Sequence, residues 1–318
     1  MAELRPKVAI IGCGNVGIRY AYSLMISGLA RSIVLVDRNM KRAEGEAMDL
    51  SHGAPYTAPV EVTAGGYSDI KGSDLVVITA GKKQLPGQSR IDLVKDNIEV
   101  FKSLIPEVVK NAPSALLLIV SNPVDILSYA AWKISRKSSN EVIGSGTVLD
   151  SARLRNSIAK HCQIDPHNVH AYVLGEHGDT EFPVWSKSSI GGMILNEYCP
   201  FCKWQKTCNH ENELDNLFTE VRDSAYRIIE KKGETSYGIG LALTRITRAI
   251  LRDENAVLPV SSLISDYLEV NDVYLSIPAI VNRNGIRELL KLDINETERK
   301  ALVKSANTLK DIIKQSGL

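Results

Sequence analysis

The sequence predicts an α/β protein in which a doubly wound parallel sheet precedes an α+β domain. Between Lys7 and Val120, short apolar runs alternate with amphipathic stretches, which is the pattern of a parallel sheet with crossover helices. Past Leu149 the rhythm changes to longer helices and hairpin-like strands. A chain of 318 residues is also long for one core, so we expect two domains, at residues 1–147 and 148–318.

Several of the expected strands are apolar on both faces, as in a sheet covered by helices on both sides. The strands expected in the first domain are Val8–Ile11, Ile33–Val36, Val60–Thr63, Leu75–Thr79 and Leu116–Val120. The helices expected between them are Val16–Ser27, Arg42–Leu50 and Asp92–Lys110. For the second domain we expect a helix at Leu149–His161, a strand at Val169–Leu174, helices at Glu211–Lys231 and Gly238–Arg252, short runs at Val257–Leu263, Val273–Ile277 and Ala279–Val281, and a last helix from about Asn295.

Composition narrows the class of protein. The 38 basic and 37 acidic side chains are interspersed and leave a net charge of +1, so no nucleic-acid or anionic-membrane partner is indicated. No apolar run approaches the roughly 20 residues that span a bilayer, and a first strand near Lys7 leaves no room for a signal peptide. Five cysteines, unevenly spread, do not suggest a disulfide framework. We therefore expect a cytoplasmic protein.

A glycine motif opens the first expected helix, directly after the first strand. In this strand–turn–helix context the backbone N–H groups and the helix terminus point at a pyrophosphate, which makes the motif more than a structural turn. Asp37 ends the second strand, where a carboxylate accepts hydrogen bonds from a ribose diol and repels the 2′-phosphate of NADP. The sequence thus predicts a Rossmann domain that binds NAD, although FAD uses the same motif. The expected cofactor residues here are Gly12, Gly14, Val16, Gly17 and Asp37.

Four further segments carry charged or polar residues where strands or turns end. His177 lies in the turn Gly175–Asp179, between two glycines that permit close approach of a ligand. Asp150 and Arg153 lie one turn apart on one helix face. The other two segments are Gly81–Arg90 and Ser121–Pro123. Taken singly, each also fits a solvated loop, a helix face or a surface turn.

Together the five segments resemble the lactate and malate dehydrogenase family, in that family's order and spacing and over essentially the whole chain. The resemblance implies that His177 is the general acid and base, with Asp150 orienting its ring. Arg153 then grips the substrate carboxylate as a bidentate fork, and Arg90, on a mobile loop, polarises the carbonyl. The same resemblance adds Gly81 to the cofactor site, Asn122 beside nicotinamide and substrate, and Thr235 and Ile239 as pocket-lining residues.

Gln84 bears on the choice of substrate. Malate enzymes of the family place an arginine on this loop to meet the second carboxylate of oxaloacetate. A neutral glutamine leaves that charge unpaired in a closed pocket, and a cost of ~4 kcal/mol would favour pyruvate roughly a thousandfold. The neighbouring Lys82 and Lys83 are cations that could soften this preference, although they lie before the residue that should point inward. The sequence therefore predicts pyruvate and L-lactate as the substrate pair.

Two residues suggest regulation. Arg153 and Arg155 are two positions apart on one helix and cannot share a face. In bacterial lactate dehydrogenases that the chain resembles, an arginine at the place of Arg155 and a histidine at that of His170 bind fructose 1,6-bisphosphate across a subunit interface. The resemblance thus implies an allosteric homotetramer, against the alternative of a solvated arginine and an unrelated strand histidine.

The segment from Cys199 to His210 is the least family-like part. Cys199 and Cys202 have the spacing of a zinc pair, but Cys208 and His210 are separated by one residue, which suits a metal poorly. We therefore expect a reduced loop and no metal.

Two rival functions stay open at this point. The close one is malate dehydrogenase or a broad 2-hydroxy-acid dehydrogenase. The other is a dinucleotide-binding protein without catalysis, which would have no need for the charged set of His177, Asp150, Arg153 and Arg90.

Overall fold

A nine-stranded sheet runs through the molecule in the order β14-β13-β12-β6-β5-β4-β1-β2-β3. The structure, a computed structural model, describes residues 6–82, 89–195 and 210–318. Six strands are parallel and have the doubly wound order 3-2-1-4-5-6, which confirms the predicted fold class. They are β1 (Lys7–Ile11), β2 (Ser32–Val36), β3 (Glu61–Ala64), β4 (Leu75–Ile78), β5 (Leu116–Ile119) and β6 (Val142–Gly144).

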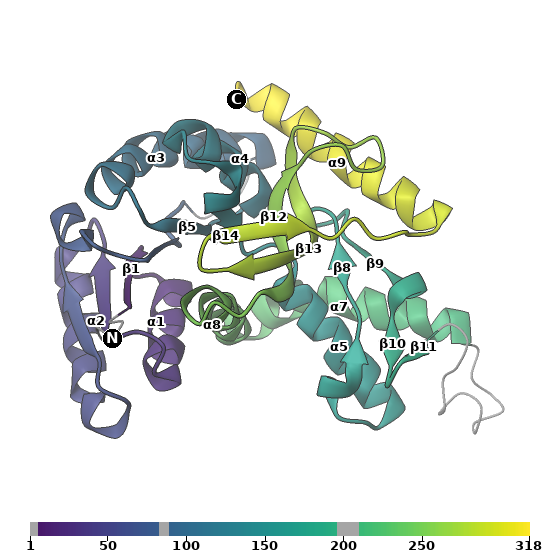
Figure 1. Cartoon of the computed structure of the whole chain (residues 1–318), viewed down its shortest axis with the longest axis horizontal. Helices are drawn as coiled ribbons and strands as arrows, with labels where there is room; N and C mark the ends of the chain where they lie inside the picture. The colour runs from purple at the N-terminus through teal and green to yellow at the C-terminus, as the bar shows by residue number, and fades with distance from the viewer. Residues whose placement is uncertain (1–5, 83–88, 196–209) are drawn as a thin grey trace.

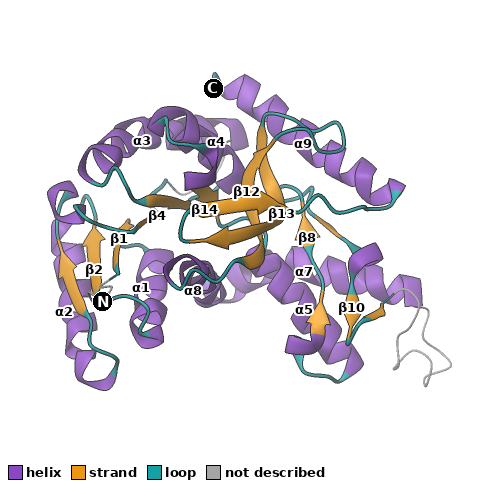
Figure 2. Ribbon diagram, in the orientation of Figure 1, coloured by secondary structure: helices purple, strands orange, loops and turns teal. Residues whose placement is uncertain are grey.

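Helices cover both faces of this sheet (Figure 2). Successive side chains of β1 alternate between two apolar cores, because side chains of a strand point to opposite faces. Val8 and Ile10 pack in the core that α1 and α8 share, whereas Ala9 and Ile11 pack in the core of α3, α4 and α9. The helices of the first half are α1 (Asn15–Ser27), α2 (Met40–His52), α3 (Arg90–Asn111) and α4 (Val124–Ser135).

The second half adds helices, small sheets and three antiparallel strands, which extend the large sheet beyond β6 (Figure 1). Its helices are α5 (Val148–Cys162), α7 (His210–Lys232), α8 (Tyr237–Leu251) and α9 (Glu296–Ser316). Its strands are β7 (Val169–His170), β8 (Val173–Leu174), β9 (Phe182–Pro183), β10 (Ser189–Ile190), β11 (Met193–Ile194), β12 (Ala256–Ile264), β13 (Val273–Asn282) and β14 (Gly285–Leu289). Single-turn 3₁₀ helices lie at Ala54–Tyr56, Tyr67–Ile70, Ser139–Glu141, Pro166–Asn168 and Trp185–Lys187.

Some expected elements are wrong in detail. The run Val169–Leu174 is two short strands in different sheets, since β7 pairs with β10 and β8 pairs with β9. The two runs expected on either side of Pro278 are one strand, β13. Pro278 lies opposite Pro259 of β12, and neither can donate a backbone hydrogen bond, so the strands pair through this position without one.

The helix α4 was not predicted, nor were the strands β6, β9, β10, β11 and β14. β6 has only three residues, which is too short for a periodic signal. In the described part of the chain, no helix combines the length and the apolar character needed to cross a membrane.

Candidate active site

The glycine turn between β1 and α1 lies where the strand order reverses, between β1 and β4. Gly12 has a φ of 109°, and a Cβ there would lie 2.7 Å from the backbone nitrogen of Ala80. A Cβ on Gly17 would overlap the carbonyl oxygen of Gly12. A Cβ on Gly14, by contrast, would meet no atom within 4 Å. Gly12 and Gly17 are thus needed for packing, whereas Gly14 borders open space at the start of α1, which carries no side-chain cap.

Asp37 is fixed at the edge of this turn. Its Oδ2 accepts a hydrogen bond from the backbone N–H of Cys13 at 2.7 Å, and its Oδ1 accepts one from Asn39 at 2.9 Å. The carboxylate is therefore held beside the glycine turn. Burial, together with the charges of Asp37 and Glu46, raises the pKa of the Cys13 thiol to about 12.

Gly81 and Asn122 follow β4 and β5, which are neighbours in the sheet. The side chain of Asn97, from α3, joins them. Its Oδ1 accepts from the N–H of Lys82 at 2.7 Å, and its Nδ2 donates to the carbonyl oxygen of Asn122 at 3.2 Å. Asn97 is fully buried, and we did not predict its role. An asparagine in the middle of a mostly apolar helix face is the signal that would have indicated it.

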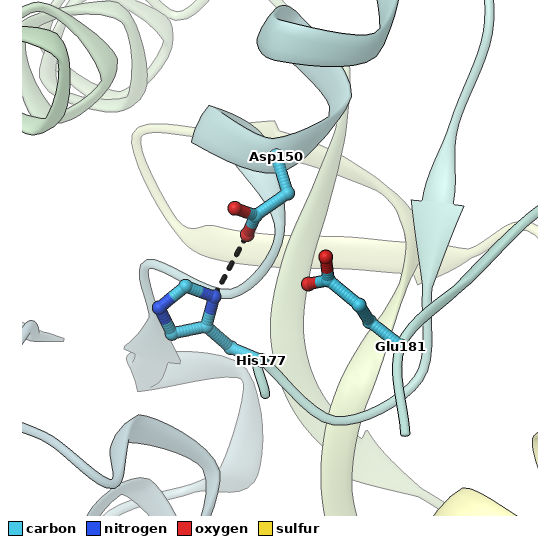
Figure 3. A group of neighbouring side chains, drawn as sticks. All are labelled: Asp150, His177 and Glu181. Atoms are coloured by element: carbon cyan, nitrogen blue, oxygen red, sulfur yellow. Dashed lines mark hydrogen bonds and ion pairs between the residues drawn. The ribbon is translucent and has the colours of Figure 1, made fainter. Parts of the chain in front are cut away.

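His177, Asp150 and Arg153 form a chain of contacts, of which Figure 3 shows the one between His177 and Asp150. The Nδ1 atom of His177 lies 2.7 Å from Oδ2 of Asp150, and the guanidinium of Arg153 donates to Oδ1 of the same carboxylate at 2.8 Å. Asp150 is buried in the first turn of α5, while the His177 side chain stays 28% exposed. Because Asp150 occupies Nδ1, the Nε2 atom of the ring is left for a reactant.

The electrostatics of this group favour a charged imidazole. Burial opposes protonation of His177, but the carboxylates of Asp150, Glu181 and Asp125 outweigh it and raise the pKa of the imidazole to about 9. Burial also favours the neutral acid of Asp150, yet His177 and Arg153 hold the pKa of Asp150 below its usual value. At neutral pH the histidine thus carries a proton that it can donate.

The backbone of His177 is anchored by Asp125, a residue that we did not predict. Oδ2 of Asp125 accepts from the N–H of His177 at 2.8 Å, and Oδ1 accepts from the hydroxyl of Ser261 at 2.6 Å. Burial raises the pKa of Asp125 to about 6, against these two hydrogen bonds, which lower it. The signal in the sequence was a lone acid near the start of the apolar segment after Pro123.

Glu176, which precedes His177 in the turn, is buried within the fold. Its backbone N–H donates to the Ser305 hydroxyl at 2.6 Å, and its Oε2 accepts from the hydroxyl of Thr180 at 2.6 Å. Asp179, by contrast, accepts from the hydroxyl of Tyr226 at 3.3 Å.

Of the remaining predicted substrate residues, the structure describes the side chains of some and not of others. Gln84 lies outside the described residues, and Arg90 begins α3 but its side chain is not described. Thr235 is half-buried in the connection between α7 and α8. Ile239, in the first turn of α8, packs against the apolar core that also contacts Val16 of the glycine turn.

Arg155, on α5, contacts the 3₁₀ turn Pro166–Asn168, and His170 follows this turn in the chain. One guanidinium nitrogen of Arg155 donates to the carbonyl oxygen of Pro166 at 3.3 Å. Its Nε is buried and has no hydrogen-bond partner within residues 6–82, 89–195 and 210–318. His170 is exposed on β7. Arg153 and Arg155 therefore have different neighbours on α5.

Most of the cysteine segment that was considered as a metal site lies outside the described residues. Cys199, Cys202 and Cys208 lie outside the described residues, and His210 begins α7 without a described side chain. In the described part, Asp150, His177 and Glu181 come close enough to share an ion, with ligand atoms within 4.8 Å of one another. The hydrogen bond between His177 and Asp150 already accounts for two of them.

Comparison with known proteins identifies the family. Residues 6–144 match the NAD-binding domain of lactate/malate dehydrogenases, and residues 147–317 match their alpha/beta C-terminal domain. The chain belongs to the lactate/malate dehydrogenase family, and its cofactor is NAD, as predicted.

The most similar relatives that we compared are all lactate dehydrogenases. The chain is 50% identical to an L-lactate dehydrogenase of Acetivibrio thermocellus over 97% of this chain and 96% of the relative. It is likewise 50% identical to that of Clostridium botulinum strain Langeland, over 98% of each chain. Among solved structures, a lactate dehydrogenase from a Medee basin deep-sea metagenome library has a TM-score of 0.94 at 41% identity, over 99% of each chain. A minor L-lactate dehydrogenase from Enterococcus mundtii has a TM-score of 0.94 at 40% identity, over 98% of each chain.

Proposed function

We propose that this member of the family is an L-lactate dehydrogenase that reduces pyruvate with NADH, with His177 as the proton donor. The observation that carries the proposal is the contact chain of His177, Asp150 and Arg153. It combines a protonated imidazole with a guanidinium in one partly buried group, which is what a 2-oxo acid needs for its carbonyl oxygen and its carboxylate. The L-lactate dehydrogenases to which the chain is similar support the same substrate.

Each residue has a role in this reaction. The glycine turn and Asp37 would hold NADH, which supplies the hydride to the carbonyl carbon. Arg153 donates one N–H to Asp150 and keeps further N–H groups for the substrate carboxylate. His177 gives the proton from Nε2 to the carbonyl oxygen, and Asp150 stabilises its ring in that orientation. In lactate oxidation the neutral imidazole takes the proton back.

Gln84 and Arg90 complete the proposal for substrate choice. Arg90 would polarise the carbonyl from the start of α3, and Gln84 would leave a second carboxylate unpaired. Malate dehydrogenase or a broad 2-hydroxy-acid dehydrogenase is the alternative. A parallel assay of NADH oxidation with pyruvate and oxaloacetate distinguishes them, and we expect a strong preference for pyruvate.

Replacing Gln84 tests the same point from the other side. Gln84→Arg should shift the ratio of kcat/KM values toward oxaloacetate by about two or more powers of ten, because an arginine pairs the second carboxylate. Gln88→Arg, on the same loop, is the matched control. Unchanged relative rates in Gln84→Arg would contradict the role of Gln84.

His177→Asn tests catalysis directly. Turnover should fall by at least about a hundredfold, since no group is left to donate the proton, while NADH binding stays nearly intact. Stopped-flow kinetics and NADH fluorescence titration measure the two quantities. Turnover like that of the parent protein would exclude His177, and absence of turnover in the parent would support a dinucleotide-binding protein without catalysis.

Activation by fructose 1,6-bisphosphate in a cytoplasmic homotetramer stays a prediction. It is supported by the contact of Arg155 with the turn that His170 follows in the chain, and by the buried Nε of Arg155 that lacks a partner in the described part. Assembly is supported by the exposed apolar side chains of α1 and α8, which are Tyr22, Ile26, Tyr237 and Leu241. Pyruvate saturation curves should shift to lower concentrations with the sugar bisphosphate and lose this response in Arg155→Gln. Identical curves for the parent protein would refute the proposal.

A further inference from the structure

A further acid, Glu181, lies beside the proposed catalytic pair of His177 and Asp150. Glu181 is buried, with 7% of its surface exposed, and ligand atoms of Glu181, Asp150 and His177 all lie within 4.8 Å of one another. Figure 3 shows its carboxylate turned toward the His177–Asp150 pair from the segment that follows the His177 turn. Glu181 takes no part in the proposed reaction.

The surroundings of Glu181 are charged on several sides. Asp150 and Arg153 face it from α5, Arg222 faces it from α7, and His177 faces it from the preceding turn. Burial and the charge of Asp150 favour the neutral acid and raise the pKa of Glu181 to about 8, although the three cations lower it. Glu181 therefore changes its charge in a pH range close to that in which the imidazole of His177 changes its own.

We propose that Glu181 is a positioning residue that sets the proton affinity of His177, its carboxylate supporting the imidazolium at alkaline pH. This inference rests on the proposed function, since the imidazolium of His177 is the proton donor. Below the pKa of Glu181 the acid is neutral and adds little. Above it, the carboxylate joins Asp150 and Asp125 in stabilising the charged ring, so His177 keeps its proton to higher pH.

The decisive measurement is the titration of the His177 imidazole by NMR, in protein with isotope-labelled histidine. The signal of His177 among the six histidines is assigned from its absence in His177→Gln. In Glu181→Gln, which keeps the size of the side chain, the titration midpoint should fall by about one pH unit. Glu181→Asp should recover part of the shift. Glu220→Gln, which removes an exposed acid from α7, is the matched control and should leave the midpoint in place.

A midpoint that does not move in Glu181→Gln overturns the inference, and it does so whether or not the protein reduces pyruvate. If Glu181→Gln fails to fold, the parent protein still gives a test. Two coupled groups titrate in two steps, so the His177 signal should show a second, smaller inflection from Glu181, and a single-step curve overturns the inference. In kinetics, the alkaline limb of kcat/KM for pyruvate should move to lower pH in Glu181→Gln, with little change at neutral pH.

Discussion

At the scale of single residues, the protonation of His177 depends on its neighbours rather than on its own chemistry. An isolated imidazole loses most of its charge near neutral pH, and burial lowers its proton affinity further. The carboxylate of Asp150, at 2.7 Å, does most to reverse this, and together with those of Glu181 and Asp125 it raises the pKa of His177 to about 9. The charged imidazole therefore persists through neutral pH and is lost as pH rises through that value.

Asp150→Asn should show this dependence. Without the carboxylate, burial dominates and the pKa of His177 falls below its present value of about 9, so less imidazolium is present at neutral pH. We expect pyruvate reduction to fall by about a hundredfold or more, and its alkaline limb to move to lower pH. Rates measured across neutral and alkaline pH test this. An unchanged alkaline limb would mean that Asp150 does not control the proton.

At the scale of elements, the turn between β1 and α1 separates two uses of glycine. Gly17 leaves no room for a methyl group because the carbonyl oxygen of Gly12 occupies the place, whereas Gly14 faces open space. The first position serves packing, and the second leaves the approach to the helix terminus free.

The pair Gly17→Ala and Gly14→Ala should separate stability from cofactor binding. Gly17→Ala should lower the free energy of unfolding by about 1–3 kcal/mol, as overpacking does. Gly14→Ala should leave unfolding nearly unchanged but weaken NADH binding about tenfold, because the methyl group enters the space of the pyrophosphate. Urea unfolding and NADH fluorescence titration measure these effects. Tight NADH binding by Gly14→Ala would place the pyrophosphate elsewhere.

Local patterns predicted the elements that carry clear signals and missed those that depend on distant contacts. The glycine motif and Asp37 could be interpreted because strand, turn and helix lie next to one another in sequence. The pairing of His177 with Asp150, 27 positions away, came only from the family resemblance. Asp125, Asn97 and Glu181 were missed, because an isolated polar residue shows its use only when the fold brings a partner to it.

At the scale of the whole molecule, residues from both halves of the chain form the hydrogen bonds that anchor the turn of His177. Asp125 comes from α4 of the first half, and Ser261 comes from β12 of the second, where β12 pairs with β6. The candidate site is thus tied to the joint between the parallel and antiparallel parts of the sheet.

Ser261→Ala tests this joint. Removing the hydroxyl deprives a buried carboxylate of one hydrogen bond and should cost about 1–3 kcal/mol of unfolding free energy. Because the pKa of Asp125 is about 6, the loss should be larger at neutral pH, where the group is charged, than at more acidic pH, where it is neutral. Turnover should also fall as His177 loosens.

Ser262→Ala, the next position on β12, is the matched control. Its hydroxyl is buried and has no hydrogen-bond partner in the described part of the chain, so its removal should be neutral or stabilising. Equal losses from both variants would show that the bond to Asp125 contributes nothing specific.

The antiparallel extension of the sheet also constrains how the chain folds during synthesis. The ribosome completes β6 before β12 exists, so the edge of β6 has no neighbour until residues up to Ile264 have emerged. An open, buried strand edge invites pairing with other chains. A nascent chain stalled between these points should be the aggregation-prone species, and chaperones that hold nascent chains should act in this interval.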